Sequence, residues 1–445
     1  MGFVLNRRRL RSTGFLAMVS LLSLSCEITN PGRLQDVFLN REEAWEGLVN
    51  GMGRSLADVL DEDALRSAVL AREVHPTGSG QIPIDQQLGT FHEYGADWRY
   101  EHRARWVAED GIRRLTGQAP HDDPPPEATP DPELLAQAYL WAGYANRLLG
   151  ELWCEAAIDA GEFLPSSAFL ERAVDHFTSA IDNAASGSDV QLAGYAGRAS
   201  AYVDLGEWES AVADAGQVAD DHWAYELPYY FGYSTWEWND LYWSSAGLPA
   251  KAHTVWNTPY APQGDSEEWA SDEGSYYAFE PNDPRLPIRV QNEGSGARMD
   301  CCGEIPWWPQ TKHDDRGANI ELSSGAEMRL IEAEYLLLNS DVMGALTIIN
   351  NLRADVGLTT QWDTSVSLDS AWAILKRERG IELWLEARRL PDLRRWVAND
   401  TPGALDPLEM VGAAAPPHHP SHLEAQALCF PVPEDERVTN PNSGG

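Results

Sequence analysis

The chain has 445 residues, a formal net charge of -36 and 43% hydrophobic residues. A chain of this length can bury one large core or two ordinary ones. Binding to nucleic acid needs a basic surface that displaces counterions from phosphates, and this composition offers none, so we expect no nucleic-acid partner. A strongly acidic surface favours solubility and repels anionic ligands.

The first 25 residues have the three parts of a secretory signal. Four arginines between positions 7 and 11 precede an apolar run over 15–24, which is too short to span a membrane. Cys26 follows directly after this run. That position is typical of a lipoprotein signal, in which Cys26 becomes the acylated first residue. We therefore predict a signal peptide over 1–25 and a tether over 26–40.

Helical periodicity predicts four helix pairs that lie far apart in the chain. Apolar residues recur at spacings of three and four, as at Ala333, Leu336 and Leu337. The predicted pairs are 41–60 with 98–115, 131–153 with 168–185, 190–204 with 207–219, and 326–338 with 342–355.

The third helix pair has the spacing of a tetratricopeptide repeat. Tyr195, Ala199, Tyr202, Gly206 and Ala211 fall where such a repeat places aromatic residues, small residues and the turn glycine. The expected fold class is mainly α, with a scaffold of about four tetratricopeptide-type helical hairpins and a large irregular, aromatic-rich insert. An all-α enzyme barrel is the alternative, although it would space its hairpins more evenly.

Three helix starts carry residues suited to capping. Asn40 is followed by Glu43 and Ser188 by Gln191, each at the three-residue spacing of a capping box. Asp131 precedes Pro132, a residue favoured in the first turn of a helix.

An insert over 221–321 interrupts the helical pattern and concentrates the aromatic residues. Residues 222–310 hold eight of the 18 Trp and eight of the 15 Tyr. An aromatic ring can lie on the apolar face of a sugar while nearby polar groups bind the hydroxyls. These aromatics could instead form the core of an irregular subdomain. The candidate ligand-binding residues are Trp236, Trp238, Asn239, Tyr242, Trp243, Trp256, Trp269, Tyr276, Tyr277, Trp307 and Trp308.

A charged helix is predicted from Ala371 towards Arg389. Glu378, Glu382 and Glu386 would lie four residues apart on it, interleaved with arginines. Catalytic carboxylates of a glycoside hydrolase face each other across the sugar, usually from separate elements. A row on one helix is therefore better explained as an ion-paired face.

Other signatures of catalysis or metal binding are missing from the sequence. His92-Glu93 is not followed by the second histidine of a zinc helix, and no glycine precedes a lysine as a phosphate loop requires. We expect no enzymatic activity, no cofactor and no metal ion. The four cysteines after Cys26 allow three disulfide pairings, which the sequence leaves open; they are Cys154, Cys301, Cys302 and Cys429.

Three segments together resemble the SusD/RagB family of nutrient-binding outer-membrane lipoproteins. They are the helical stretch from Met328 to Trp396, the cysteine at position 26, and the proline-punctuated tail over 428–442. The resemblance implies a protein anchored to the outer membrane by lipid and exposed at the cell surface. It also implies a SusC-like TonB-dependent transporter barrel as partner and an oligosaccharide or peptide as cargo.

The resemblance also implies where the cargo binds. In this family the site lies where the insert meets the loops after the first helix, which adds Trp98 and the loop over 75–80 as candidates. The alternatives are an extracellular glycoside hydrolase, a peptide-binding RagB-like member, and a scaffold that binds only protein. The expected parts are a signal peptide (1–25), a tether (26–40), an N-terminal helical part (41–220), the binding insert (221–321) and a C-terminal SusD/RagB part (322–445).

Overall fold

The computed structural model describes residues 36–77, 95–118, 128–230, 238–247, 250–256, 258–261, 283–289, 306–406, 409 and 428–442. The predictions for the signal peptide and Cys26 lie outside these ranges. So do those for Trp236, Trp269, Tyr276 and Tyr277, and for Cys301 and Cys302.

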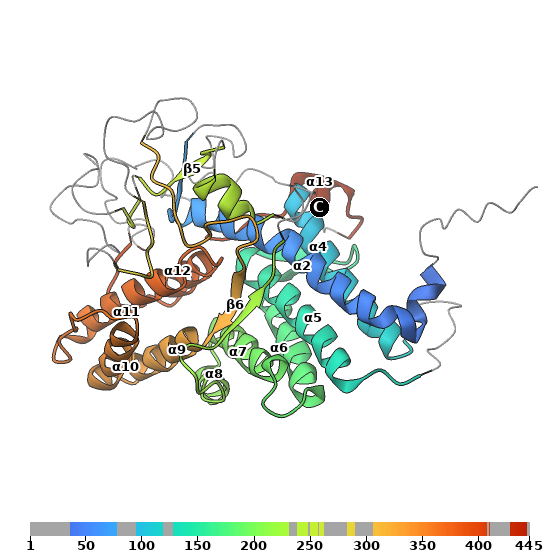
Figure 1. Cartoon of the computed structure of the whole chain (residues 1–445), viewed down its shortest axis with the longest axis horizontal. Helices are drawn as coiled ribbons and strands as arrows, with labels where there is room; N and C mark the ends of the chain where they lie inside the picture. The colour runs from blue at the N-terminus through green and yellow to red at the C-terminus, as the bar shows by residue number, and fades with distance from the viewer. Residues whose placement is uncertain are drawn as a thin grey trace, which may run out of the picture.

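The described chain is mainly helical, as the sequence predicts (Figure 1). The N-terminal helices are α2 (Glu42–Leu70), α4 (Gly95–Leu115), α5 (Pro132–Leu152), α6 (Ser166–Asn183), α7 (Asp189–Leu205) and α8 (Trp208–Ala215). The C-terminal helices are α9 (Gly325–Leu338), α10 (Val342–Asp355), α11 (Leu368–Glu382), α12 (Arg389–Ala398) and α13 (Glu434–Thr439). Short helical turns are η1 (Asp36–Asn40) and η3 (Tyr242–Ala246). The strands are β1 (His75–Pro76), β2 (Glu155–Ala157), β3 (Phe163–Pro165), β4 (Ala224–Leu227), β5 (His253–Thr254) and β6 (Ile320–Ser324).

The four predicted helix pairs are present as α2 with α4, α5 with α6, α7 with α8, and α9 with α10. Close packing depends on small residues at the contacts. A Cβ at Gly143 of α5 or Gly197 of α7 would lie within 2.6 Å of the Phe177 ring on α6. Ala199 and Ala211, predicted as the small residues of the third pair, are both fully buried.

Two of the three predicted helix caps are confirmed. Asp131 accepts hydrogen bonds from the backbone of Glu133 and Leu134, and Ser188 accepts one from Gln191. The Asn40 capping box is wrong. The helix starts one residue later, with no side-chain cap, because the Asn40 amide oxygen accepts a hydrogen bond from Arg114 of α4 instead.

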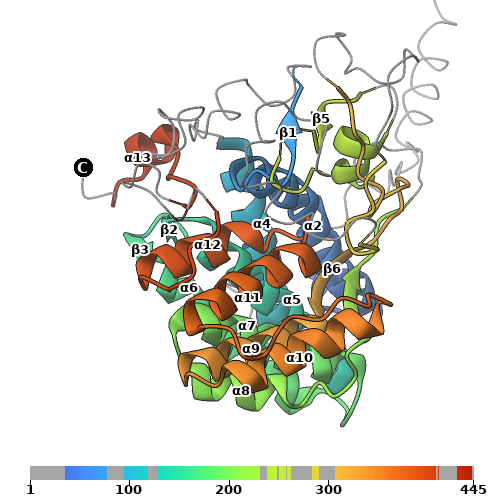
Figure 2. The ribbon, with the colours of Figure 1, turned by 90° about the vertical axis from the view of Figure 1, so that its left-hand side faces the viewer.

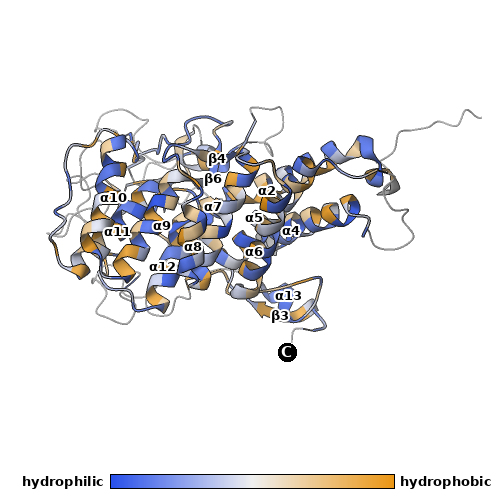
Figure 3. Ribbon diagram, turned by 90° about the horizontal axis from the view of Figure 1, so that it is seen from below, coloured by the Kyte–Doolittle hydropathy of each residue, from blue (hydrophilic) through white to orange (hydrophobic). Residues whose placement is uncertain are grey.

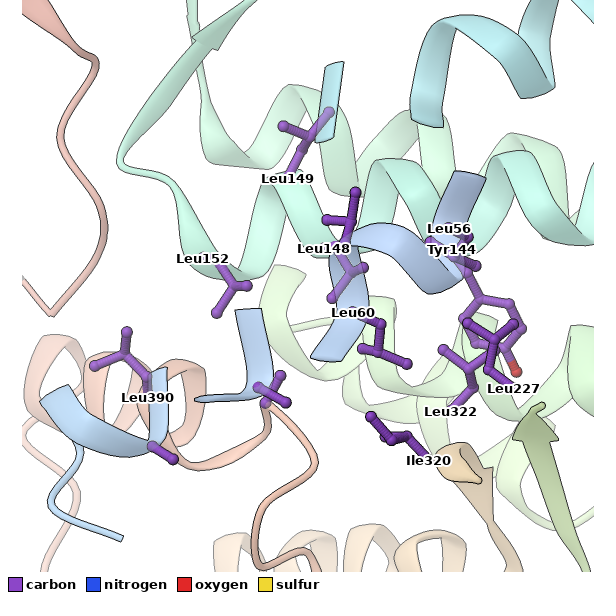
Figure 4. Close-up of a cluster of buried hydrophobic side chains, with 14 of the residues drawn as sticks. Leu56, Leu60, Tyr144, Leu148, Leu149, Leu152, Leu227, Ile320, Leu322 and Leu390 are labelled. Carbon is purple, nitrogen blue, oxygen red and sulfur yellow. The ribbon is translucent and has the colours of Figure 1, made fainter. Parts of the chain in front are cut away.

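The largest core lies between the N-terminal helices, β4, β6 and α12. Figure 4 shows Leu56 and Leu60 of α2 beside Tyr144 and Leu148 of α5, with Leu227, Ile320 and Leu322 of the two strands below them. Apolar and polar residues alternate along the helices (Figure 3), as expected when one side of each helix faces a core. Segments separated by more than 250 residues therefore share one hydrophobic interior.

The insert begins and ends at one strand pair. β4 pairs antiparallel with β6, with Ala224 opposite Ser324 and Leu227 opposite Ile320. β1 pairs antiparallel with β5 at the other end of the molecule from α8 and α10 (Figure 2), so the segment after α2 meets the insert there. This contact brings residues about 180 positions apart into the same small sheet.

The charged helix predicted from Ala371 to Arg389 is wrong in its extent. The chain leaves the helical conformation after Glu382 and starts α12 at Arg389. Between them Leu385 and Ala387 adopt positive φ angles of 62° and 60°, a conformation costly for residues other than glycine. The Leu385 N–H donates to the buried Glu73 carboxylate at 3.0 Å, a tertiary contact that the helical pattern does not reveal.

One disulfide joins distant parts of the chain. Cys154, directly after α5, is bonded to Cys429 in the tail, 275 residues later. The Cys429 region also forms a bridge between Trp153 and Phe430. Closing a loop of this length is expected to stabilise the protein by roughly 3 to 5 kcal/mol, mainly by restricting the unfolded chain. Such bonds persist outside the cytoplasm.

Buried guanidinium groups connect the two halves of the scaffold. Arg388 donates to Glu151 of α5 at 2.5 Å and to Glu327 of α9 at 2.6 Å. Arg395 of α12 donates to Glu334 of α9 at 2.5 Å. Burial alone would raise the pKa of Asp392, yet the neighbouring Arg379 and Arg395 hold that pKa at about 2.

Loss of one buried cation should destabilise the whole protein. We predict that Arg388→Met, which removes a shared cation from two buried carboxylates, lowers the free energy of unfolding by about 3 to 5 kcal/mol. The control is Arg437→Met, since Arg437 pairs with Glu155 while their side chains are 44% and 37% exposed. That variant should lose less than about 1 kcal/mol. Chemical denaturation of both variants checks this, and equal losses would contradict a scaffold held by buried charge.

Candidate functional site

One part of the aromatic insert is the segment over 238–247, which contains η3. The rings of Trp238 and Trp243 lie 5.8 Å apart at an angle of 46°. The guanidinium of Arg316 lies over the Trp238 ring, 3.7 Å from its centroid. One face of Trp238 is therefore covered by a cation, so a ligand that stacks on this ring has to use its other face.

Asn239 fixes the backbone of this segment. Its carboxamide oxygen accepts a hydrogen bond from the N–H of Tyr242, and its amide group donates to the carbonyl of Ala318 at 2.8 Å. The Asn239 side chain is fully buried, which suits a residue that positions the aromatic segment. Direct contact with a ligand would need a different arrangement of this side chain.

A second group of aromatics lies on β5 and the strand-like segment after residue 305. Trp256 is half-buried, and its ring lies 6.5 Å from that of His75 on β1, in an edge-to-face arrangement. The Trp307 indole donates to the carbonyl of His253, while the backbone N–H of Trp308 donates to the Thr254 hydroxyl. β5 contacts η3, so the two aromatic groups are neighbours.

Predicted site residues thus divide into two sets. Trp238, Tyr242, Trp243 and Trp256 are half-buried and adjoin one another through η3 and β5. Trp98, Trp307 and Trp308 are at most 5% exposed. Trp98 packs against His102 and Trp153 inside the N-terminal core, and Lys251 lies over the Trp307 ring. Buried rings of this kind offer no face for a sugar in the described arrangement.

The glutamates predicted as an ion-paired face are paired, but they are buried and their partners come from elsewhere. Glu378 binds Arg353 at 2.8 Å and Arg285 at 2.9 Å, and Arg285 also reaches Glu382. Burial raises the pKa of Glu386 to about 8, although the adjacent Lys312 opposes this. Arg285 and Lys312 belong to the insert. The row of glutamates therefore attaches the insert to the scaffold.

Two carboxyl groups attach the aromatic segment to α2. The Asp61 carboxylate accepts hydrogen bonds from the backbone of Glu62 at 3.0 Å and of Asp240 at 2.9 Å. Burial, together with the nearby Asp61 and Glu62, raises the pKa of Asp240 to about 9. Burial likewise raises the pKa of Asp61 to about 7. Arg66, which pairs with Glu62, is the cation that opposes these shifts at Asp240.

A further carboxyl pair lies beneath this contact. Asp63 of α2 and Glu101 of α4 are 1% and 2% exposed, and the Trp153 indole donates to Glu101. Burial raises the pKa of both, to about 7 for Glu101. Hydrolysis of a glycoside needs two carboxyl groups facing an open sugar site at a separation of about 5 to 10 Å. Both carboxyl pairs are instead enclosed within the scaffold or engaged with backbone.

Within the described ranges, no group of three or more His, Cys, Asp or Glu side chains is arranged to hold a metal ion. Sequence analysis did not single out Arg316, Arg285 or Lys312. Apart from Asp283 beside Arg285, the partners named for these residues lie about 70 to 100 residues away, and no local pattern marks them.

Raising the pH should weaken the attachment of the aromatic segment. The pKa of Asp240 is higher in the folded protein than its usual value, so the folded state binds a proton more tightly than the unfolded state. The stability of the protein therefore falls as the pH rises from about 4 through about 9. We predict that Asp240→Asn removes this loss. The free energy of unfolding of the variant minus that of wild type should increase by up to about 1.4 kcal/mol for each pH unit between pH 6 and 8.5. Denaturation at several pH values measures it, with the exposed Asp355→Asn as control. Parallel curves for wild type and Asp240→Asn would refute the role of this proton.

Comparison with known proteins gives both a sequence match and a fold match. Residues 325–442 match the sequence model of the SusD family. No curated protein matches the chain significantly. A SusD-like carbohydrate-binding protein from Bacteroides fragilis NCTC 9343 is similar in structure, with a TM-score of 0.64 and 14% identity over 92% of this chain and all of that one.

Two other solved structures have the same fold. A SusD superfamily protein from Bacteroides vulgatus ATCC 8482 has a TM-score of 0.59 and 14% identity, over 90% of this chain and 97% of that one. A laminarin-binding SusD-like protein has a TM-score of 0.59 and 15% identity, over 91% of this chain and 98% of that one. Together with the sequence match over α9 to the tail, the shared fold confirms the predicted resemblance: residues 325–442 match the SusD family, and the chain has the fold of SusD superfamily proteins.

Proposed function

We propose that this protein captures an oligosaccharide at the cell surface and delivers it to a SusC-like TonB-dependent transporter, without covalent chemistry. The observation that carries this proposal is the aromatic group over 238–256, held at the junction of α2, β1 and the insert. Trp238, Trp243 and Trp256 keep part of their surface exposed there. Stacking on such rings is a common way to hold the apolar face of a sugar.

Several features support glycan as the cargo. The chain shares its fold with proteins described as carbohydrate-binding and laminarin-binding. The half-buried rings stand beside polar groups of neighbouring segments, such as the Arg316 guanidinium over Trp238. The overall charge of -36 disfavours strongly anionic cargo and therefore favours a neutral oligosaccharide. A peptide cargo is the alternative class.

The carboxyl groups in the described part of the site are already engaged or enclosed, which supports a binding role. Asp61 uses both carboxylate oxygens to accept backbone hydrogen bonds, and Asp63 and Glu101 are enclosed. Holding and releasing cargo requires only that affinity change when the transporter is engaged.

The proposed location is the outer membrane, with the protein anchored through an acylated Cys26. No helix of the described ranges is long and apolar enough to cross a membrane. The disulfide between Cys154 and Cys429 suits a compartment outside the cytoplasm. The disulfide supports a signal peptide that exports the chain.

Acylation of Cys26 is tested by metabolic labelling. We predict that labelled palmitate enters the wild type, and that Cys26→Ala abolishes both the labelling and the association with the outer-membrane fraction. Cys302→Ala serves as control because it removes a cysteine but keeps the signal motif. A wild type that is membrane-bound without label would refute the lipid anchor.

Loss of two stacking rings should weaken cargo binding. We predict that Trp238→Ala with Trp243→Ala lowers the affinity for a neutral oligosaccharide about tenfold or more, since each stacked ring contributes about 0.5 to 1.5 kcal/mol. Trp106→Ala is the matched control, because Trp106 is 45% exposed on α4 and lies outside the aromatic group. Calorimetry against a panel of oligosaccharides, beginning with laminarin fragments, and of peptides measures the effect.

The same titrations decide between the alternatives. Binding of peptides alone would replace glycan by peptide as the cargo class. Normal binding by the double variant, with melting several degrees lower than wild type, would show that the two rings serve only the core. Turnover of any oligosaccharide by the pure protein would refute the non-enzymatic role.

A further inference from the structure

An apolar groove lies at the end of α2 that is remote from the insert. It has a volume of about 790 Å³ and runs between η1, the first turns of α2 and the middle of α4. The apolar side chains of Phe38, Leu39, Leu48 and Val107 line it, together with Gly47 and Gly51. Volumes of this size are typical of sites for small apolar ligands.

The two glycines make the groove deep enough for a thin occupant. They are one helical turn apart on α2, and a Cβ at either position would meet no atom within 4 Å. Both lie on the exposed side of the helix. Any other residue at these positions would project into the groove and narrow it, so the groove depends on their lack of side chains.

The chemistry of the lining favours a hydrocarbon chain over a peptide. A peptide segment brings backbone N–H and C=O groups that need hydrogen-bonding partners when they are buried. Apart from Arg41 and Glu43, the residues that line the groove have hydrocarbon side chains or are glycines, and the backbone groups of Leu48 and Gly51 lie within α2. Of its two charged residues, Arg41 lies over the Phe38 ring, 4.3 Å from the centroid. A hydrocarbon chain needs no such partners.

The position of the groove in the chain identifies the source of that hydrocarbon. Phe38 and Leu39 belong to η1, the first element of the described chain, and Cys26 lies ten residues before its start at Asp36. Ten residues can extend up to roughly 35 Å, which lets a group on Cys26 reach the groove. We propose that the groove binds one acyl chain of the lipid on Cys26 when that chain is not in the membrane. This inference rests on the proposed acylation.

Such a site would partly shield the lipid while the protein is in transit between membranes. It would also oppose membrane attachment, since an acyl chain held in the groove no longer contributes to insertion. Filling the groove should therefore have two opposite effects: weaker binding of a free fatty acid to the protein, and tighter binding of the lipidated protein to vesicles.

The first experiment uses the mature chain carrying Cys26→Ala, with palmitate as the probe. We expect saturable binding of one palmitate per chain, and at least tenfold weaker binding after Gly47→Leu with Gly51→Leu. The matched control is Gly47→Ala with Gly51→Ala, which makes the same change in helix propensity but fills little of the groove. Both pairs should melt no lower than the parent, because Ala and Leu favour helix and the space is open.

The second experiment uses the lipidated protein and phosphatidylethanolamine–phosphatidylglycerol vesicles. We expect the leucine pair to partition into vesicles several-fold more strongly than wild type, and the alanine pair to differ little. Absence of saturable palmitate binding would overturn the proposal, and so would equal binding by the leucine pair. Self-association of the wild type that the leucine pair abolishes would assign the groove to a second copy of the chain instead.

These outcomes are separable from a failure of the proposed function. If Cys26 is not labelled by palmitate, the chain has no acyl group to place in the groove, whatever the palmitate titration gives. If Cys26 is labelled but the Cys26→Ala chain binds no palmitate, only the proposed role of the groove is refuted. Oligosaccharide binding is measured on the same variants and should be unchanged, because the groove lies along the first turns of α2, whereas the aromatic segment contacts α2 further along, at Asp61.

Discussion

Buried arginine–glutamate pairs hold together helices that are remote in the chain. Arg388 stands between α5 and α9, and Arg395 joins α12 to Glu334 of α9. Separate helix pairs can slide against each other when only apolar surface is shared, whereas charged hydrogen bonds fix one relative position. Because removing water from these groups is costly, an alternative packing that left any of them unpaired would be strongly disfavoured. The helical scaffold thus has one arrangement on which the insert can be built.

Polar and charged contacts also attach the insert to the helical scaffold. Arg285 and Lys312 attach it to the segment around Glu378 and Glu386, and Asp240 attaches it to α2. Each contact joins a loop to a helix that is already fixed. Aromatic residues on a loop can then be held at a defined spacing without a regular sheet beneath them. This arrangement is a frequent basis of recognition, in which a rigid scaffold presents variable loops.

Local sequence patterns predicted the positions of most helices, but they did not predict the contacts between residues that are far apart in the chain. The caps at Asp131 and Ser188 and the small residues Ala199 and Ala211 depend on neighbours a few residues away, so spacing alone revealed them. The break after Glu382 depends on Glu73, more than 300 residues earlier, and no local pattern contains that information.

The candidate site shows the same limit. Aromatic enrichment located the insert, and the predicted Trp238 and Trp243 are adjacent in space. The burial of Trp98, Trp307 and Trp308 could not be deduced, because an indole is equally suited to a core and to a sugar platform. The roles of Arg316 beside Trp238 and of Lys312 beside Glu386 could not be predicted for a different reason: isolated basic residues in a loop form no periodic pattern.

The disulfide gives the protein the topology of a closed ring. The covalent path from Cys154 through the insert to Cys429 returns to its starting point, so both the aromatic segment and the paired glutamates lie within the ring. A single cut by an extracellular protease anywhere along that path opens the ring but releases no fragment. Buried ion pairs and the shared core would continue to hold the two new ends near each other. A chain closed in this way can therefore be cut once in an exposed loop within the ring and remain one covalent molecule.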